Sequence, residues 1–438
     1  MIASPFLTEI DPQAAIKGSR DPLGIQPIWT RLGRRVVGNL TTVSTSVRDF
    51  TTTILGYYLA ERLADEGSAD RLGVFLRWEQ LASYARGAIN NDWEFRGTER
   101  AKRNFNEGGK VRLGTDSAAL ILSDQKTYGL WGLYSVPSRS SGLLEGDPAH
   151  VTPAVRKFIA DEYVPTLSEN GRDNLSALES LLARKSSELR PQERDRAFLQ
   201  PLGRALQREL SRRERVFYRE HLLEGGPDDR TQGGQRVLVE ALKTTFDVEE
   251  WALEAAAIRH LANRCRIQGG RGLDVADSLE RICVAEQLLA PAVELFMLLL
   301  NCDGQLPKDV AVAVRRRWGP KVASIDPDAI EGLRGEFADG QDERGSAERW
   351  ASLARALASG DYAAALSLLM EQNRAVMSSR GSAAPWVEVR DGKLHVRFLD
   401  ETGRQLPSRD ELPSLWTNSY FIDSLRAVAM QVDAAPRG

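Results

Sequence analysis

A chain of 438 residues, of which 42% are hydrophobic, is long enough to bury one or more cores, and this excludes disorder for most of its length. The formal net charge of −3 excludes an overall basic surface, so any contact with nucleic acid must come from a local patch. The three cysteines, Cys265, Cys283 and Cys302, are too few and too widely spaced for a disulfide framework or a Cys-x-x-Cys metal site.

The N-terminal residues carry acidic side chains where a secretory signal peptide needs a basic start. The most apolar segment, residues 288–300, is interrupted by Glu294 and is shorter than a membrane-spanning helix. We therefore expect a cytoplasmic protein that does not enter a membrane.

The chain begins with a proline-rich stretch over residues 1–27, which predicts an extended arm. A short helix is expected over residues 28–37. It places Arg31, Arg34 and Arg35 on neighbouring turns, and they would form a basic ridge.

The stretch from Val36 to Leu63 organises the next part of the chain, and its periodicity predicts a helix after a break at Gly38-Asn39. One stripe of this helix is apolar and faces a core: Val43, Val47, Phe50, Ile54 and Tyr57. The opposite stripe surrounds a guanidinium with hydroxyls: Thr41, Thr45, Arg48 and Thr52. Such a stripe suits phosphate oxygens or a carboxylate. The alternative is that the hydroxyls bond carbonyls one turn earlier inside a bundle.

Two further helices are expected before residue 110. Residues 69–89 repeat an amphipathic pattern, and ERAKRNFNEGGK predicts a basic helix that ends at paired glycines.

The segment from Arg112 to Gly146 has the rhythm of a helix-turn-helix motif. A short helix over residues 116–122, a break at Ser123-Asp124 and a second helix from Gln125 to about Tyr134 are expected. Lys126 on the second helix and Arg139 in the following loop would then be available to phosphates. Gly129 and Gly132 indicate either a close approach of another segment or an irregular helix.

The rest of the chain divides into four predicted segments. Residues 147–325 are expected to form a central helical domain, 326–346 an acidic, glycine-rich loop, and 347–385 a helical hairpin. In residues 386–438, alternation around Asp391-Gly392 predicts a β-hairpin, with a terminal helix docked on it. Together with an N-terminal helical domain over residues 28–146, the fold class is mainly α: a multi-helix bundle with a helix-turn-helix-like N-terminal region and a small C-terminal β-hairpin plus helix.

A search for catalytic chemistry finds no motif. The four histidines are scattered, without the spacing of metal ligands, and glycine clusters at residues 232 and 268 lack the features of a nucleotide-binding loop. We therefore assign no catalytic residue, no metal and no cofactor.

Three blocks of the sequence resemble helical proteins of undetermined function that are encoded in prokaryotic defence islands beside helicases or nucleases. The blocks are PLGIQPIWTRLGRRVVGNLTTVSTSVRDFTTTILGYYLAER, LSDQKTYGLWGLYSVPSRSSGLL and LWTNSYFIDSL. They cover about the first third of the chain and its last tail. The resemblance implies a subunit that acts with partner enzymes, such as a helicase or nuclease, on foreign DNA; it assigns no residue roles.

Two functions remain open, with a third behind them. In the first, the chain is a non-catalytic DNA-binding adaptor subunit of a multiprotein complex, which contacts phosphates through the basic and hydroxylic residues named above. In the second, the chain is a helical scaffold that binds only proteins. The third is a metal-dependent nuclease with an unfamiliar site.

Overall fold

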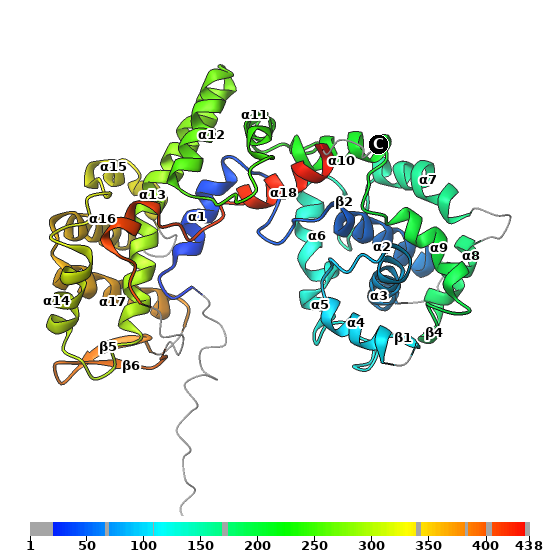
Figure 1. Ribbon diagram of the computed structural model, residues 1–438, viewed down its shortest axis with the longest axis horizontal. Coiled ribbons are helices and arrows are strands. Elements are labelled where there is room, and N and C mark those ends of the chain that lie inside the picture. Colours follow the sequence, from blue (N-terminus) through cyan, green and yellow to red (C-terminus); the bar gives the residue numbers. More distant parts are fainter. Residues whose placement is uncertain are drawn as a thin grey trace, which may run out of the picture. The chain divides into compact units, whose positions relative to one another are not determined.

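The computed structural model describes residues 21–65, 70–107, 109–168, 174–338, 343–381, 384–399 and 405–433 (Figure 1). Helices dominate these residues, and the strands form small two-stranded sheets, so the prediction of a mainly α fold is confirmed. Most of the predicted arm, residues 1–20, lies outside the described residues. The chain divides into two compact units. Unit 1 comprises residues 1–36 and 249–420, and unit 2 comprises residues 37–248 and 421–438.

Unit 2 is a helical unit with two small sheets. Its helices are α2 (Val47–Asp65), α3 (Arg71–Asn90), α4 (Thr98–Asn106), α5 (Gln125–Tyr128), α6 (Leu130–Ser140), α7 (Pro153–Leu167), α8 (Asn174–Ala183), α9 (Arg196–Ala205), α10 (Arg212–Tyr218), the π-helix η2 (Arg219–Leu223), α11 (Gly234–Leu242), the 3-10 helix η3 (Lys243–Thr245) and α18 (Ile422–Asp433). The antiparallel strand pairs are β1 (Val111–Gly114) with β4 (Ser186–Leu189) and β2 (Leu144–Glu145) with β3 (His150–Val151).

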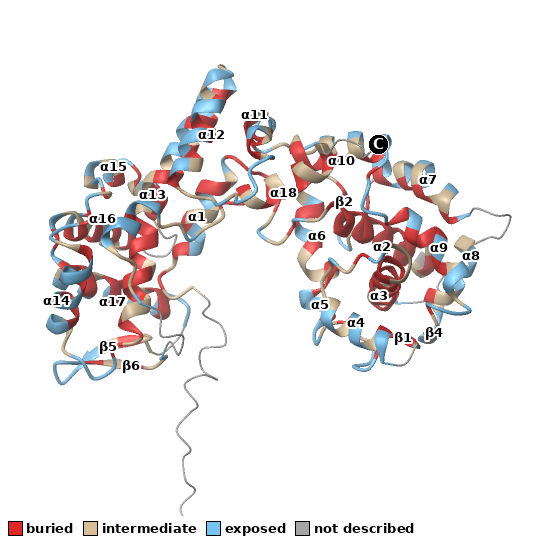
Figure 2. Cartoon of the chain, in the orientation of Figure 1, coloured by how far each residue is buried: buried red, intermediate tan, exposed pale blue. Residues whose placement is uncertain are grey.

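The core of unit 2 is built around α3, which is buried along most of its length (Figure 2). The Asp70 carboxylate caps this helix by accepting a hydrogen bond of 2.8 Å from the amide of Gly73. Helix α2 packs closely on α3 at Gly56, where an added Cβ would lie 2.7 Å from the rings of Phe75 and Trp78. A glycine within a helix costs about 1 kcal/mol relative to alanine, and here the close helix packing offsets that cost.

Unit 1 is also mainly helical and contains the third sheet. Its helices are α1 (Ile25–Arg34), α12 (Ala255–Ile267), α13 (Arg271–Leu299), α14 (Pro307–Trp318), α15 (Pro327–Glu331), the 3-10 helix η4 (Arg334–Phe337), α16 (Glu343–Ser359), α17 (Tyr362–Ser379) and the 3-10 helix η5 (Arg409–Ser414). Helix α13 is the spine of the unit. Among the described residues it is the one helix long and apolar enough to cross a membrane, but 72% of its most apolar window is buried inside the protein, as in a core helix.

The C-terminal β-hairpin forms as predicted. Strands β5 (Val387–Arg390) and β6 (Lys393–Val396) pair antiparallel, and the two turn residues have positive φ angles, 51° at Asp391 and 76° at Gly392. These angles are those of the tight turn that an Asp-Gly pair favours. The helical hairpin predicted over residues 347–385 is also present as α16 and α17.

Three other predicted elements differ from the structure. Helices α15 and η4 occupy part of the expected acidic loop over residues 326–346, of which residues 339–342 lie outside the described part. The expected helix over residues 116–122 is replaced by turns. The terminal helix α18 belongs to unit 2, where it packs against α2, α11 and η2, whereas the β-hairpin belongs to unit 1.

The central threonine-rich stretch is helical only from Val47 onward. Before it, the amide of Thr41 donates to the hydroxyl of Ser44 at 2.7 Å, and the amide of Ser44 donates to the carbonyl of Thr41. Such local bonds compete with helix formation. The first helical turn is completed from α18, because the side-chain oxygen of Gln431 accepts the amide of Val47 at 2.9 Å.

Candidate functional site

Arg48 is buried by its own chain, so the expectation that it faces a ligand is wrong. Its guanidinium pairs with both carboxylate oxygens of Glu214 on α10 and donates to the carbonyl of Glu209 at 2.7 Å. The hydroxyl of Tyr163 donates to the same carboxylate at 2.6 Å. Burial alone would lower the pKa of Arg48, but the hydrogen bond and charge of Glu214 raise it overall. The pair therefore fastens α2 to α10.

The three candidate threonines do not form one face beside Arg48. Thr41 and Thr45 lie before α2, where Thr41 is half-buried and Thr45 is exposed. Thr52 is buried in α2, and its hydroxyl donates to the carbonyl of Arg48 at 2.8 Å. The hydroxyl of Thr53 donates in the same way to Asp49 at 2.7 Å. In α2 the hydroxyls thus bond the preceding turn, as the alternative interpretation predicted.

The arginines of α1 belong to unit 1 and are engaged there. Arg31 donates to backbone carbonyls around Glu336, at 2.6 Å to Glu336 itself and at 3.1 Å to Ala338. Arg35 forms an ion pair with the buried Glu336 carboxylate, and Arg34 is half-buried. The basic ridge predicted from the sequence therefore holds η4 against α1.

Lys126 and Arg139 are exposed on unit 2. Arg139 donates to the carbonyl of Gly146 at 2.5 Å, which closes the loop after α6. The short helix α5 carries Lys126, and Pro137 lies within α6, which runs on to Ser140. The helix expected from Gln125 to about Tyr134 is thus divided at Gly129, and its second part continues beyond the expected end.

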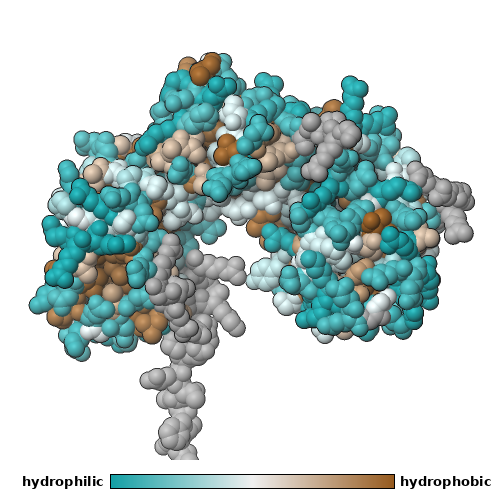
Figure 3. All heavy atoms as spheres, viewed as in Figure 1, coloured by the Kyte–Doolittle hydropathy of each residue, from teal (hydrophilic) through white to brown (hydrophobic). Residues whose placement is uncertain are grey.

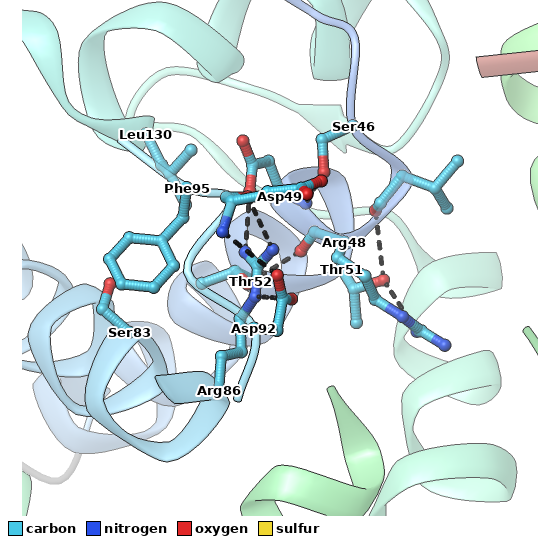
Figure 4. Close-up of polar contacts among 12 residues, drawn as sticks. Ser46, Arg48, Asp49, Thr51, Thr52, Ser83, Arg86, Asp92, Phe95 and Leu130 are labelled. Atoms are coloured by element: carbon cyan, nitrogen blue, oxygen red, sulfur yellow. Dashed lines mark hydrogen bonds and ion pairs between the residues drawn. The ribbon is translucent and has the colours of Figure 1, made fainter. Parts of the chain in front are cut away.

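A network of buried charges lies between α2 and α3. The guanidinium of Arg86 donates to Asp49 at 3.0 Å and to Asp92 at 2.9 Å, as Figure 4 shows. Burial raises the pKa of Asp49, although the charge of Arg86 and its hydrogen bond act in the opposite direction. The cavity beside this network measures about 10 Å³, which is the space of a single water molecule. The network can therefore hold α2, α3 and the following loop together, but it has no room for a substrate.

Glu79 connects the same region to α5 and α6. Its carboxylate accepts hydrogen bonds of 2.7 Å from the side-chain amide of Gln125 and from the backbone amide of Leu130. An added Cβ at Gly129 would lie 2.8 Å from the Glu79 oxygens, so this glycine permits the close approach that the sequence indicated. Burial raises the pKa of Glu79 to about 7, despite both hydrogen bonds.

A hollow of about 590 Å³ opens on unit 2 where the end of α3, α4 and the start of α9 meet. Its residues are Gly87, Ala88, Ile89, Asn91, Trp93, Lys102, Phe105, Asn106, Gln192 and Arg196. None of these described lining residues is acidic. We call it the α4 hollow.

The two cations of the α4 hollow lack carboxylate partners among the described residues. The Lys102 ammonium lies 5.8 Å from the centre of the Trp93 ring, and Arg196 donates to the carbonyl of Ala88 at 3.0 Å. The indole of Trp93 can lie against α3 because Gly87 has no side chain: a Cβ there would be 2.5 Å from the ring. The result is an open site with two positive charges, an aromatic wall and three side-chain amides, a set that suits an anionic, partly aromatic ligand.

Sequence reasoning recognised the basic character of α4 but did not assign Lys102, Trp93 or Arg196 to a site. The signal available was ERAKRNFNEGGK, which predicts a basic helix. Nothing in the sequence indicates that Arg196, far along the chain, lies beside that helix.

Within the described residues, no group of three or more histidine, cysteine, aspartate or glutamate side chains is placed to hold a metal ion. No protein-family model, curated protein or solved structure matches this chain.

Proposed function

We propose that this protein is a DNA-binding adaptor subunit and that it contacts nucleic acid through the α4 hollow. The observation that carries the proposal is the composition of the hollow. Lys102 and Arg196 line it, none of its described lining residues is acidic, and the chain as a whole is slightly acidic. The DNA-binding function expected from the sequence is thus retained, but on different residues.

The charges support contact with a phosphate backbone. Cations without a carboxylate partner can release the counterions of DNA when they bind it, and this release makes the affinity fall with salt. Arg103 on α4 adds a further exposed cation that has no ion-pair partner among the described residues. Arg31, Arg35 and Arg48 offer less to a phosphate, because they are already bonded within the chain.

The uncharged lining supports a nucleotide rather than a bare anion. Trp93 and Phe105 give the hollow an aromatic wall, and Asn91, Asn106 and Gln192 can each donate and accept hydrogen bonds. Sites for single-stranded nucleic acid combine cations with aromatic side chains in this way. The resemblance to defence-island proteins supports a role beside a helicase or nuclease.

The test is the affinity of the purified chain for labelled single-stranded and duplex oligonucleotides, measured by fluorescence anisotropy across a salt series. The expected result is binding that weakens steeply with salt. Lys102→Glu should weaken binding to all sequences and reduce the salt slope by about 1. No binding at low salt would overturn the proposal and leave the protein-binding scaffold.

The matched control is Lys308→Glu on α14. Lys308 is also an exposed lysine that has no ion-pair partner among the described residues, and it belongs to unit 1. Both variants change the net charge equally, so a general electrostatic effect would weaken binding equally in both. Equal weakening would contradict a specific role for the α4 hollow.

A further inference from the structure

A second hollow, of about 520 Å³, lies on unit 2 between α7 and α10. Its floor is apolar: the rings of Phe158 and Phe217 stack face to face, with 3.8 Å between their centres and 5° between their planes. Val216 beside them is 63% exposed. A cluster of apolar side chains at an open surface indicates an interaction site more often than a single exposed residue does.

Charged residues without ion-pair partners surround this floor. Arg212 and Arg213 come from the first turn of α10, Asp161 from α7 and Glu220 from η2. Among the described residues, none of these four side chains forms an ion pair, whereas charged neighbours that face inward are paired, as Arg48 is with Glu214. The unpaired charges of α10 and η2 therefore gather around the apolar floor.

A third carboxylate of the hollow, that of Glu162, accepts a hydrogen bond from the hydroxyl of Ser211. The charged side chains of the hollow that remain without a partner among the described residues are balanced, with two cations and two anions around one apolar centre. An acidic or a basic partner would complement only half of such a surface. A second copy of the same surface, turned by a two-fold rotation, can complement all of it, because each residue then meets its counterpart in reverse. Arginines of one copy face carboxylates of the other, and the valine and phenylalanine side chains meet between them.

We propose that this surface is where two copies of the chain associate as a two-fold symmetric dimer, with Val216 and Phe217 at the centre and ion pairs between Arg212 or Arg213 and Asp161 or Glu220 at the rim. Removal of the exposed apolar surface from water provides the favourable free energy. The rim charges favour this orientation, since an arrangement that placed the arginines of the two copies side by side would bring like charges together. This inference goes beyond the proposed DNA contact and uses different residues.

The first test measures the molar mass of the full chain by light scattering across a concentration series. The expected result is a rise from the mass of one chain towards that of two as the concentration increases. Val216→Glu should hold the protein at the mass of one chain, because two carboxylates would meet at the centre of the dimer. Since Val216 is exposed, this variant is expected to keep the melting temperature of the original chain.

The matched control is Val312→Glu on α14, another exposed valine, which lies in unit 1. Figure 3 shows apolar side chains gathered on unit 1, at the left of the view, so this control also tests a second apolar surface. Val312→Glu should leave the dimer intact. Loss of the dimer in this variant rather than in Val216→Glu, or one-chain mass for the original protein at every concentration, would overturn the proposal.

A charge-reversal pair separates a contact between copies from an effect on folding. One variant carries Arg212→Glu and Arg213→Glu, and the other carries Asp161→Lys and Glu220→Lys. Each alone should be monomeric, because the four side chains at positions 161, 212, 213 and 220 then all carry the same sign of charge. Mixed together they should form a two-chain species, since opposite rims face each other. Failure of the mixed variants to associate would contradict the proposed register.

Discussion

Arg48 on α2 and Glu214 on α10 form a buried ion pair between residues that lie 166 positions apart in the sequence. The first turn of α10 holds the carboxylate in place, because Glu214 also accepts the amide of Ser211 at 2.6 Å in a capping box. The pair thus joins the early stretch of the chain to the middle of unit 2, and Arg48 is not available to an external phosphate.

Arg48→Met should destabilise the protein by roughly 3–5 kcal/mol, because it leaves the Glu214 carboxylate buried without its counter-charge. Urea unfolding measures the change. The double variant Arg48→Met with Glu214→Leu should recover most of the lost free energy, since no isolated charge then remains. A single variant as stable as the original chain would show that Arg48 is solvated in solution.

Glu79 should make stability depend on pH in the mildly acidic range. Its folded pKa of about 7 lies above the ordinary value of 4.5, so between these values the folded chain holds a proton that the unfolded chain has released. The contribution of this carboxyl to stability is therefore greatest below about pH 4.5, falls as the pH rises to about 7, and is constant above that. The fall is on the order of 3 kcal/mol.

The measurement compares the free energy of unfolding of the original chain and of Glu79→Gln at several pH values. Glutamine does not titrate, so the difference between the two proteins isolates this one group. The original chain should lose stability relative to the variant as the pH rises through this range. A difference that is the same at all pH values would contradict the raised pKa.

Periodicity in the sequence was enough to predict the helical class, the α16–α17 hairpin and the turn at Asp391-Gly392. The helices follow from the spacing of apolar residues along the chain. The β-hairpin follows from the alternation of polar and apolar residues around an Asp-Gly pair, which favours the positive φ angles of a tight turn. The stretch before Val47 was mispredicted as helix because the hydroxyls of such residues as Ser44 can bond the local backbone instead.

The candidate site could not be predicted for a different reason. A helical wheel shows that Arg48 and Thr52 are on the same side of α2, but it does not show what covers that side. Glu214 covers it from a distant part of the chain. The same limit applies to the α4 hollow, where Lys102 was recognisable as part of a basic helix but its neighbour Arg196 was not.

Gly56→Ala should destabilise the protein by about 1–3 kcal/mol, because the new methyl group would lie 2.7 Å from the rings of Phe75 and Trp78 and force α2 and α3 apart. Thermal unfolding measures the loss. Gly335→Ala in η4 is the control, since an added Cβ there meets nothing within 4 Å. Equal losses in the two variants would show that the effect comes from the backbone rather than from the helix contact.

Glu286→Ala should destabilise unit 1 by about 3 kcal/mol or more, because buried donors would lose their acceptor. The Glu286 carboxylate is fully buried in α13 and accepts the amide of Thr417 at 2.6 Å, the amide of Asn418 at 3.1 Å and the hydroxyl of Tyr420 at 2.5 Å. It thereby fixes the segment that leads to α18, so limited proteolysis should cut this segment faster in the variant.

Glu280→Ala on the same helix is the control. Glu280 is exposed and forms its ion pair at the surface, an interaction worth about 0–1 kcal/mol. Faster cleavage in both variants alike would mean that Glu286 does not hold the segment.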